Sequence, residues 1–78
     1  MAKFAPVHWK DFEKFLFFIG CEFVSQKASH RKYSRKDLLR PVIVTVSKKG
    51  MLPTRDIKCN LRTLKIPIPE YLKILDQL

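Results

Sequence analysis

The residue best suited to proton chemistry at neutral pH is His30, the single histidine of the stretch FVSQKASHRKYSR at residues 23–35. An imidazole titrates near physiological pH, so it can accept or donate a proton where a lysine or an arginine cannot. Ser29 precedes it directly. The nearby cations are Lys27, Arg31 and Lys32. These residues leave two interpretations open: an ordinary histidine on a solvated surface, or a residue that transfers protons.

The positive charge of the chain is concentrated in its middle. The formal net charge is +9 at pH 7, yet residues 1–26 sum to zero and residues 66–78 to −1, so residues 27–65 carry +10. Repulsion within such a segment costs stability, and counterion release favours phosphate contacts, so a polyanionic partner such as nucleic acid is expected. A solvated face that only maintains solubility is the alternative. An anionic membrane is disfavoured, because the cations do not share one face of an amphipathic helix.

The length of 78 residues and the residue types argue against several kinds of site. One domain over residues 1–78 is expected, and a domain this small buries only about 60% of its unfolded surface, so an active site would be open. Cys21 and Cys59 have no further cysteine or histidine at metal-ligand spacing, so we expect reduced thiols, no metal and no cofactor. The N-terminus lacks the apolar core of a secretion signal and no stretch could span a membrane, which predicts a cytoplasmic protein.

The elements that would position His30 follow from the spacing of apolar residues. Helical spacing before Gly20 gives way to period-two alternation after it, and β-branched residues then dominate one stretch. The expected elements are a helix at 8–19, strands at 22–26, 30–35 and 41–46, a basic helix at 54–65, a short helix starting near Pro69, and turns at 27–29 and 47–51. This order, α-β-β-β-α with a short C-terminal helix, predicts an α+β fold with a three-stranded antiparallel sheet.

Strand alternation predicts the direction of His30. Tyr33 is the residue of its strand that a core would take, so alternation places His30 and Lys32 on the opposite face. Arg31 and Arg35 share the face of Tyr33, and we expect them at the sheet margin, where long side chains reach water. Helices on one face of an antiparallel sheet leave the other face to solvent, so His30 is expected on the open face.

Two surfaces of the predicted helices are candidates for contacts. Phe17 and Phe18 overfill the apolar stripe of the first helix, so either a second helix packs over them or they form a surface for a partner. Arg55, Lys58 and Arg62 surround the apolar stripe of the second helix. These cations would follow a nucleic-acid backbone, with a solvated face as the alternative.

The order of these elements and several of their residues resemble the HicA family of bacterial toxins, also described as YcfA-like. In that family a helix ending in glycine precedes a strand, a Gly-Ser-His or Gly-Thr-His signature opens the second strand, and an aromatic lies three residues after the histidine. A valine-rich strand and two helices follow. The counterparts here span nearly the whole chain: Gly20, FVSQK, Ala28-Ser29-His30 with Tyr33, VIVTV, DIKCNLRTLKI and PEYLKIL.

The resemblance implies a fold like the double-stranded RNA-binding domain and an mRNA-cleaving toxin neutralised by a HicB-type antitoxin protein. It also implies that His30 is the catalytic residue. Because no carboxylate or His/Cys cluster has metal-ligand spacing, we expect cleavage without a metal. The expected RNA-binding residues are Lys27, Ser29, Arg31, Lys32, Lys48, Lys49, Arg55, Lys58 and Arg62.

The sequence departs from the family pattern at several positions. Ala28 stands where the family has a glycine free to take a positive φ, and Lys65 replaces the glycine that closes the second helix. Ser47-Lys48-Lys49 replaces a Pro-x-His element that follows the third strand. Two alternatives to a ribonuclease therefore stay open: a non-catalytic RNA-binding module of the same fold, and an interaction protein that presents Phe17, Phe18 and the basic face to a protein partner.

Overall fold

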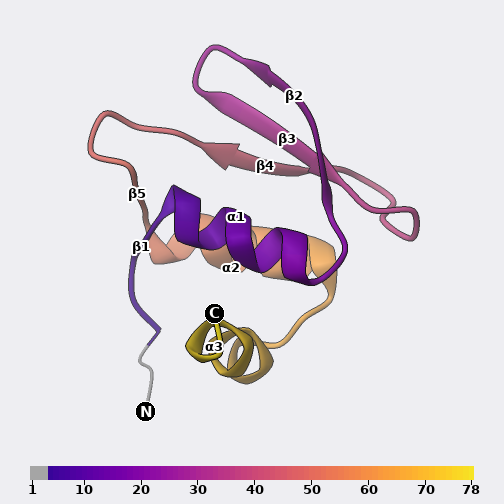
Figure 1. The fold of residues 1–78 in the computed structure, drawn as a ribbon, viewed down its shortest axis with the longest axis vertical. Coiled ribbons are helices and arrows are strands. Elements are labelled where there is room, and N and C mark those ends of the chain that lie inside the picture. Colours follow the sequence, from indigo (N-terminus) through magenta and orange to yellow (C-terminus); the bar gives the residue numbers. More distant parts are fainter. Residues whose placement is uncertain (1–3) are drawn as a thin grey trace.

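The computed structural model describes residues 4–78 and has the α+β architecture expected from the sequence (Figure 1). Its elements are β1 (Val7–His8), α1 (Trp9–Phe18), β2 (Glu22–Lys27), β3 (His30–Ser34), β4 (Val42–Thr45), β5 (Met51–Leu52), α2 (Thr54–Leu64) and α3 (Ile68–Asp76). Strands β2, β3 and β4 form an antiparallel sheet in that order, and β1 pairs with β5 in a second, antiparallel sheet. No helix within residues 4–78 is long and apolar enough to cross a membrane.

The pair β1–β5 was not predicted. His8 was expected inside the first helix and Met51 inside a turn, but the two residues are paired strand neighbours. The helix accordingly begins at Trp9, and the turn closes at Gly50, whose N–H donates to the Ser47 carbonyl at 3.0 Å. Strands of two residues are too short to leave a period-two pattern in the sequence, so periodicity could not reveal them.

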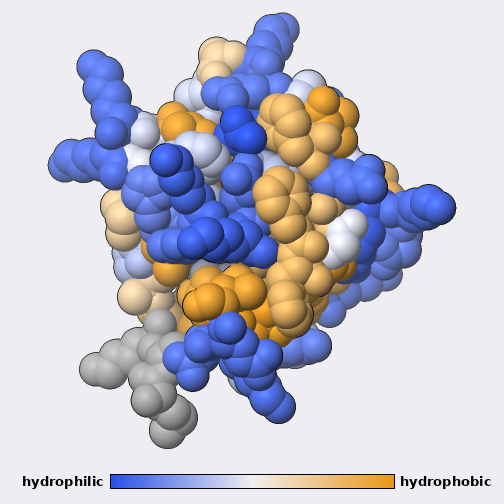
Figure 2. All heavy atoms as spheres, in the orientation of Figure 1, coloured by the Kyte–Doolittle hydropathy of each residue, from blue (hydrophilic) through white to orange (hydrophobic). Residues whose placement is uncertain are grey.

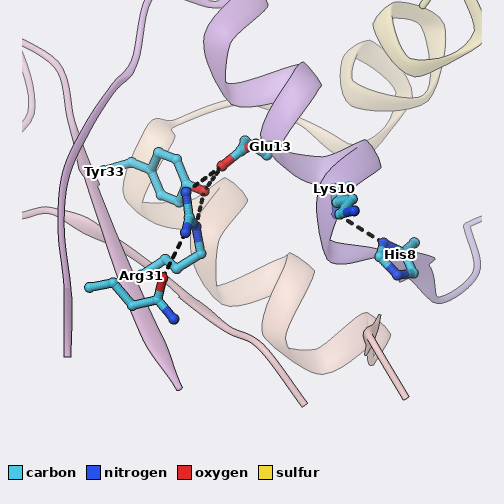
Figure 3. A network of polar contacts seen from close by, with 6 residues as sticks. His8, Lys10, Glu13, Arg31 and Tyr33 are labelled. Atoms are coloured by element: carbon cyan, nitrogen blue, oxygen red, sulfur yellow. Dashed lines mark hydrogen bonds and ion pairs between the residues drawn. The ribbon is translucent and has the colours of Figure 1, made fainter. Parts of the chain in front are cut away.

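His8 has a structural role at the start of α1. Its Nδ1 accepts a hydrogen bond from the Lys10 N–H at 3.1 Å, which caps the helix (Figure 3). Gly50 packs against the same imidazole with φ of +75°, and a Cβ at Gly50 would collide with that ring. The Trp9 N–H donates to the Gly50 carbonyl at 2.7 Å. His8 therefore fixes the junction of β1, α1 and β5.

The helices lie on one side of the three-stranded sheet, and the core forms between these two layers (Figure 1). Tyr33, Val42 and Val44 point from the sheet into this core and are fully buried. The helices and adjoining segments contribute Phe12, Phe15, Leu16, Cys21, Leu52, Ile57, Leu61, Leu64 and Tyr71. Burial of one face only leaves the opposite face of the sheet open to solvent, as the sequence predicted.

Strand β2 contains a bulge that strand alternation did not predict. The paired residues are Glu22 with Ser34, Phe23 with Tyr33, Ser25 with Lys32, Gln26 with Arg31, and Lys27 with His30. Val24 is therefore the extra residue of β2. One extra residue reverses the parity of the strand beyond it, so the bulge turns Gln26 toward the helices and Lys27 toward the open face.

Helix α2 packs beneath β4 through its apolar side. Its buried residues are Ile57, Asn60, Leu61 and Leu64. The Asn60 side chain donates to the Ile43 carbonyl at 3.1 Å, which satisfies a polar group at the edge of the sheet. The helix ends at Lys65, which adopts the left-handed conformation at φ 59°. Glycine is the usual residue at such a helix end, because a Cβ is disfavoured there.

Candidate nucleic-acid interface

His30 is the first residue of β3 and is exposed on the open face of the sheet. Its neighbours across the strands are Lys27 on β2 and Thr45 on β4. Tyr33, three residues further along β3, points into the core. The predicted outward direction of His30 and inward direction of Tyr33 are therefore both confirmed.

The turn before His30 is held in a defined shape by its backbone. Ala28 has a φ of 54°, so it takes the conformation that usually requires glycine. The Gln26 side-chain amide donates to the Ala28 carbonyl at 3.0 Å. The Val46 N–H donates to the Ser29 carbonyl at 2.7 Å, which ties the end of β4 to this turn. These contacts fix the backbone on which Ser29 and His30 stand.

Several predicted RNA-binding residues gather at this end of the sheet. Lys27 and Lys32 are exposed and share the face of His30, because alternation and cross-strand pairing place all three on one side. Lys48 and Lys49 lie in the loop after β4, at the end of the sheet that carries the β2–β3 turn (Figure 1). We call this group of residues the sheet-face cluster: Lys27, Ser29, His30, Lys32, Lys48 and Lys49.

Arg31 faces the helices, as alternation predicted, and its guanidinium is hydrogen-bonded to protein groups (Figure 3). Its Nε donates to the Tyr33 hydroxyl at 2.9 Å, and its Nη1 donates to Gln26 Oε1 at 2.7 Å. Its Nη2 donates to Glu13 Oε2 at 3.0 Å, forming an ion pair with α1. Only 19% of the Arg31 side chain is exposed. Three donors of this guanidinium are therefore already used within the protein, and a contact of Arg31 with RNA stays a prediction.

Aromatic groups complete this network. The Arg31 Cζ lies 4.3 Å from the ring centroid of Phe23 and 5.0 Å from that of Trp9, in contact range for cation–π attraction. The Tyr33 hydroxyl donates to the Glu13 carboxylate. Burial raises the pKa of Tyr33 to about 12, so the phenol remains a hydrogen-bond donor at neutral pH. The network joins β2, β3 and α1 on the side of the sheet opposite His30.

The sequence held a partial signal for this network. Trp9 and Glu13 are four residues apart, so they lie on one side of a helix. That spacing does not reveal which strand the carboxylate meets. The bulge that turns Gln26 inward left no signal in the sequence, so the sequence could not predict all the hydrogen-bond partners of Arg31.

The cations of α2 are not brought together with the sheet-face cluster. Arg55, Lys58 and Arg62 are exposed, and helical spacing puts them opposite the buried side of α2 that packs under the sheet. The ammonium of Lys58 lies 5.8 Å from the ring centroid of Phe4, in the segment before β1. The predicted basic surface is therefore divided, with one part on the open sheet and another on the outer side of the helix layer.

Exposed aromatic residues form a second surface on α1 and β2. Phe17, Phe18 and Phe23 are 48%, 58% and 44% exposed, so no second helix within residues 4–78 covers them. Phe17 and Phe23 both contact the ring of Tyr33, at centroid distances of 5.9 and 5.8 Å. Figure 2 shows apolar side chains between charged ones on the face that α1 presents. The interpretation in which a second helix covers Phe17 and Phe18 is therefore wrong for the described residues. The other interpretation, a surface for a partner, stays a prediction.

The chemistry available at the sheet-face cluster is proton transfer and phosphate binding. His30 can exchange protons with a bound molecule, and the neighbouring ammonium groups can bind anions. No cluster of three metal-ligating side chains occurs within residues 4–78, where Cys21 is buried and Cys59 is exposed. Searches against protein-family models, curated proteins and solved structures gave no match to this chain.

Proposed function

We propose that this chain is a HicA-like toxin that binds RNA on the open face of its sheet and cleaves it with His30. The carrying observation is the position of His30. His30 is the first residue of β3, the central strand of the sheet, and lies on the solvent-exposed face beside Lys27 and close to Lys32. A histidine in this position is accessible to an extended polymer and is surrounded by charge that attracts phosphates.

Backbone geometry supports the resemblance to the HicA pattern. Within residues 4–78, Ala28 and Lys65 are the non-glycine residues with positive φ, at 54° and 59°. Both stand at positions where the family pattern has glycine, as does Arg55, which lies inside α2 and does not have a positive φ. A divergent member of that family is expected to keep the positive φ at these positions even where another residue has replaced glycine. The order of helices and strands agrees with the fold like the double-stranded RNA-binding domain that we propose.

The proposed reaction is cleavage of the RNA backbone without a metal. A base removes the proton of the 2′-hydroxyl, whose oxygen attacks phosphorus while the bond to the leaving oxygen breaks, and that oxygen takes up a proton. His30 supplies one of these two proton transfers, and water on the open face supplies the other. Lys27 and Lys32 stabilise the charge on the phosphate, and Ser29 orients the substrate.

The first alternative is an RNA-binding module without activity. It is favoured by the immediate cross-strand neighbours of His30, Lys27 and Thr45, since neither is a second histidine or a carboxylate. Ser47-Lys48-Lys49 also occupies the place of the Pro-x-His element in the family pattern. This alternative predicts salt-dependent RNA binding with no cleavage.

We further propose a protein partner of the HicB type in the cytoplasm. With a net charge of +9, the chain favours a partner with an acidic surface, which would compete with RNA for the sheet-face cluster. The exposed Phe17, Phe18 and Phe23 add an apolar area that a partner can bury. An interaction protein without RNA affinity is the second alternative, and the absence of salt-dependent RNA binding would favour it.

Controlled expression in a bacterial host tests the proposed function. The wild type is expected to stop growth and deplete mRNA, whereas His30→Ala is expected to do neither. The matched control is His8→Asn, which removes the other histidine but keeps an oxygen able to cap α1. This control should remain toxic. Equal toxicity of the wild type and His30→Ala would refute the catalytic assignment.

A further inference from the structure

A hollow lies at the opposite end of β3 from His30, where the start of β2 meets the segment that follows β3. It has a volume of about 550 Å³ and is lined by Gly20, Glu22, Val24, Ser34, Arg35, Lys36 and Leu38. Ser34 is paired with Glu22 and shares the face of His30, because Ser34 and His30 are four positions apart on β3. At about 3.3 Å per residue, Ser34 is about 13 Å from His30 along the strand.

The walls of this hollow are built by specific local contacts. The bulge of β2 adds Val24, whose side chain is 53% exposed and lines the hollow. Arg35 is held in place by hydrogen bonds to Asp37 at 2.6 and 3.1 Å and to the Ile19 carbonyl at 2.9 Å. The Leu38 N–H donates to the Arg35 carbonyl at 3.0 Å. Bulges commonly redirect a side chain beside a functional site, and this one supplies an apolar wall.

Glu22 is the unusual residue of the hollow. It is exposed on a face whose other charged residues include Lys27, Lys32 and Lys36, and it forms neither of the ion pairs found within residues 4–78. A carboxylate beside a phosphate track repels the backbone, so its useful contact with RNA is to a donor on a base. Carboxylates accept hydrogen bonds from the amino groups of bases.

We propose that this hollow is a guanine-binding subsite for single-stranded RNA. Guanine is the base whose Watson–Crick edge presents two adjacent donors, N1–H and the N2 amino group, which match the two oxygens of Glu22. Its O6 accepts a hydrogen bond from the Ser34 hydroxyl or the Lys36 ammonium. Val24 and Leu38 provide apolar contact for the ring. Unpaired bases are recognised through this edge, whereas a duplex hides it, so the subsite selects single strands.

This inference rests on the proposed RNA-binding function and adds a base preference to it. Glu22 and Ser34 lie on the same face of the sheet as His30 and within the reach of a few nucleotides, so a guanine in the hollow would fix which phosphate meets His30. Positioning of this kind raises the rate by holding the phosphate near His30, although the guanine contacts themselves transfer no proton.

Binding of short oligonucleotides to the full chain tests the subsite. The probes are oligouridines with one internal guanosine or one internal inosine, methylated at every 2′-oxygen so that binding is measured without cleavage. Inosine lacks only the N2 amino group. The wild type is expected to bind the guanosine probe about 10-fold more tightly than the inosine probe, and Glu22→Gln is expected to bind both equally. Glu70→Gln, which makes the same charge change at an exposed position on α3, should keep the preference.

The outcomes separate the subsite from the ribonuclease. Equal binding of the two probes by the wild type, or an unchanged preference in Glu22→Gln, would overturn the subsite even if the protein cleaves RNA. A guanine preference that Glu22→Gln abolishes, in a protein that does not cleave RNA, would support the subsite and refute only the ribonuclease. No binding of either probe would overturn both.

Discussion

The division of the basic surface leads to a quantitative prediction about RNA binding. Lys27 and Lys32 lie on the open sheet face with His30, whereas Arg55 and Arg62 lie on the outer side of α2. The double variants Lys27→Ala/Lys32→Ala and Arg55→Ala/Arg62→Ala each remove two exposed cations, so they have the same net charge. If RNA binds on the open sheet face, only the first pair contacts phosphates, and the two variants should differ.

The expected difference in salt dependence between the two variants follows from counterion release. Each phosphate neutralised on a single strand contributes about 0.7 to the slope of log affinity against log salt. Losing Lys27 and Lys32 should therefore lower the slope by about 1.4, equivalent to about 25-fold in affinity over a tenfold range of salt. Arg55→Ala/Arg62→Ala should leave the slope unchanged, apart from a small uniform loss of long-range attraction.

The assay is fluorescence anisotropy of a labelled single-stranded RNA titrated with protein at several potassium chloride concentrations. Circular dichroism of each variant checks that it is folded. An equal fall in slope for both variants would mean that RNA contacts both sides of the protein. A larger fall for Arg55→Ala/Arg62→Ala would refute the placement of the interface on the sheet.

Three further predictions concern stability, measured by urea unfolding followed through the single tryptophan. Ala28→Gly should stabilise the protein by about 1 kcal/mol, because glycine takes the observed φ of 54° without strain; a destabilised variant would contradict that geometry. Tyr71→Phe should also gain about 1 kcal/mol, since the buried Tyr71 hydroxyl has no hydrogen-bond partner among the described residues. Burial raises the pKa of Tyr71 to about 12, above about 10 in the unfolded chain, so the stability contributed by the protonated phenol is complete below pH 10 and is lost toward pH 12. The free energy of unfolding should therefore fall more steeply between about pH 10 and about pH 12 in the wild type than in Tyr71→Phe. Glu13→Gln should cost about 1–2 kcal/mol because it removes the charged acceptor of Arg31 and Tyr33, and an unchanged stability would show that the network contributes nothing.

The sequence predicted the direction of His30 because period two is a direct consequence of strand geometry. One buried anchor, Tyr33, was enough to assign both faces of β3. The same reasoning failed on β2, where the extra residue Val24 changes the parity midway along the strand. A bulge has no obligatory residue type at such a position, so periodicity cannot locate it.

The division of the cations between two sides of the protein shows a second limit of prediction from sequence. Helical spacing correctly placed Arg55, Lys58 and Arg62 around the apolar stripe of α2, but it does not show how that stripe is oriented toward the sheet. That orientation depends on long-range packing, including the contact from Asn60 to β4. The distribution of charge along the sequence therefore predicted a polyanionic partner. It could not predict that the cations of this chain lie on two different sides of the protein.

The most direct test of the central claim is the single-turnover rate of RNA cleavage by wild type and His30→Ala, measured with all RNA bound and EDTA present. The prediction is a loss of about 100-fold or more in rate with RNA affinity nearly unchanged, because general acid-base catalysis contributes at least that much. His8→Asn should cleave at the wild-type rate. Equal rates for the wild type and His30→Ala would contradict catalysis by His30.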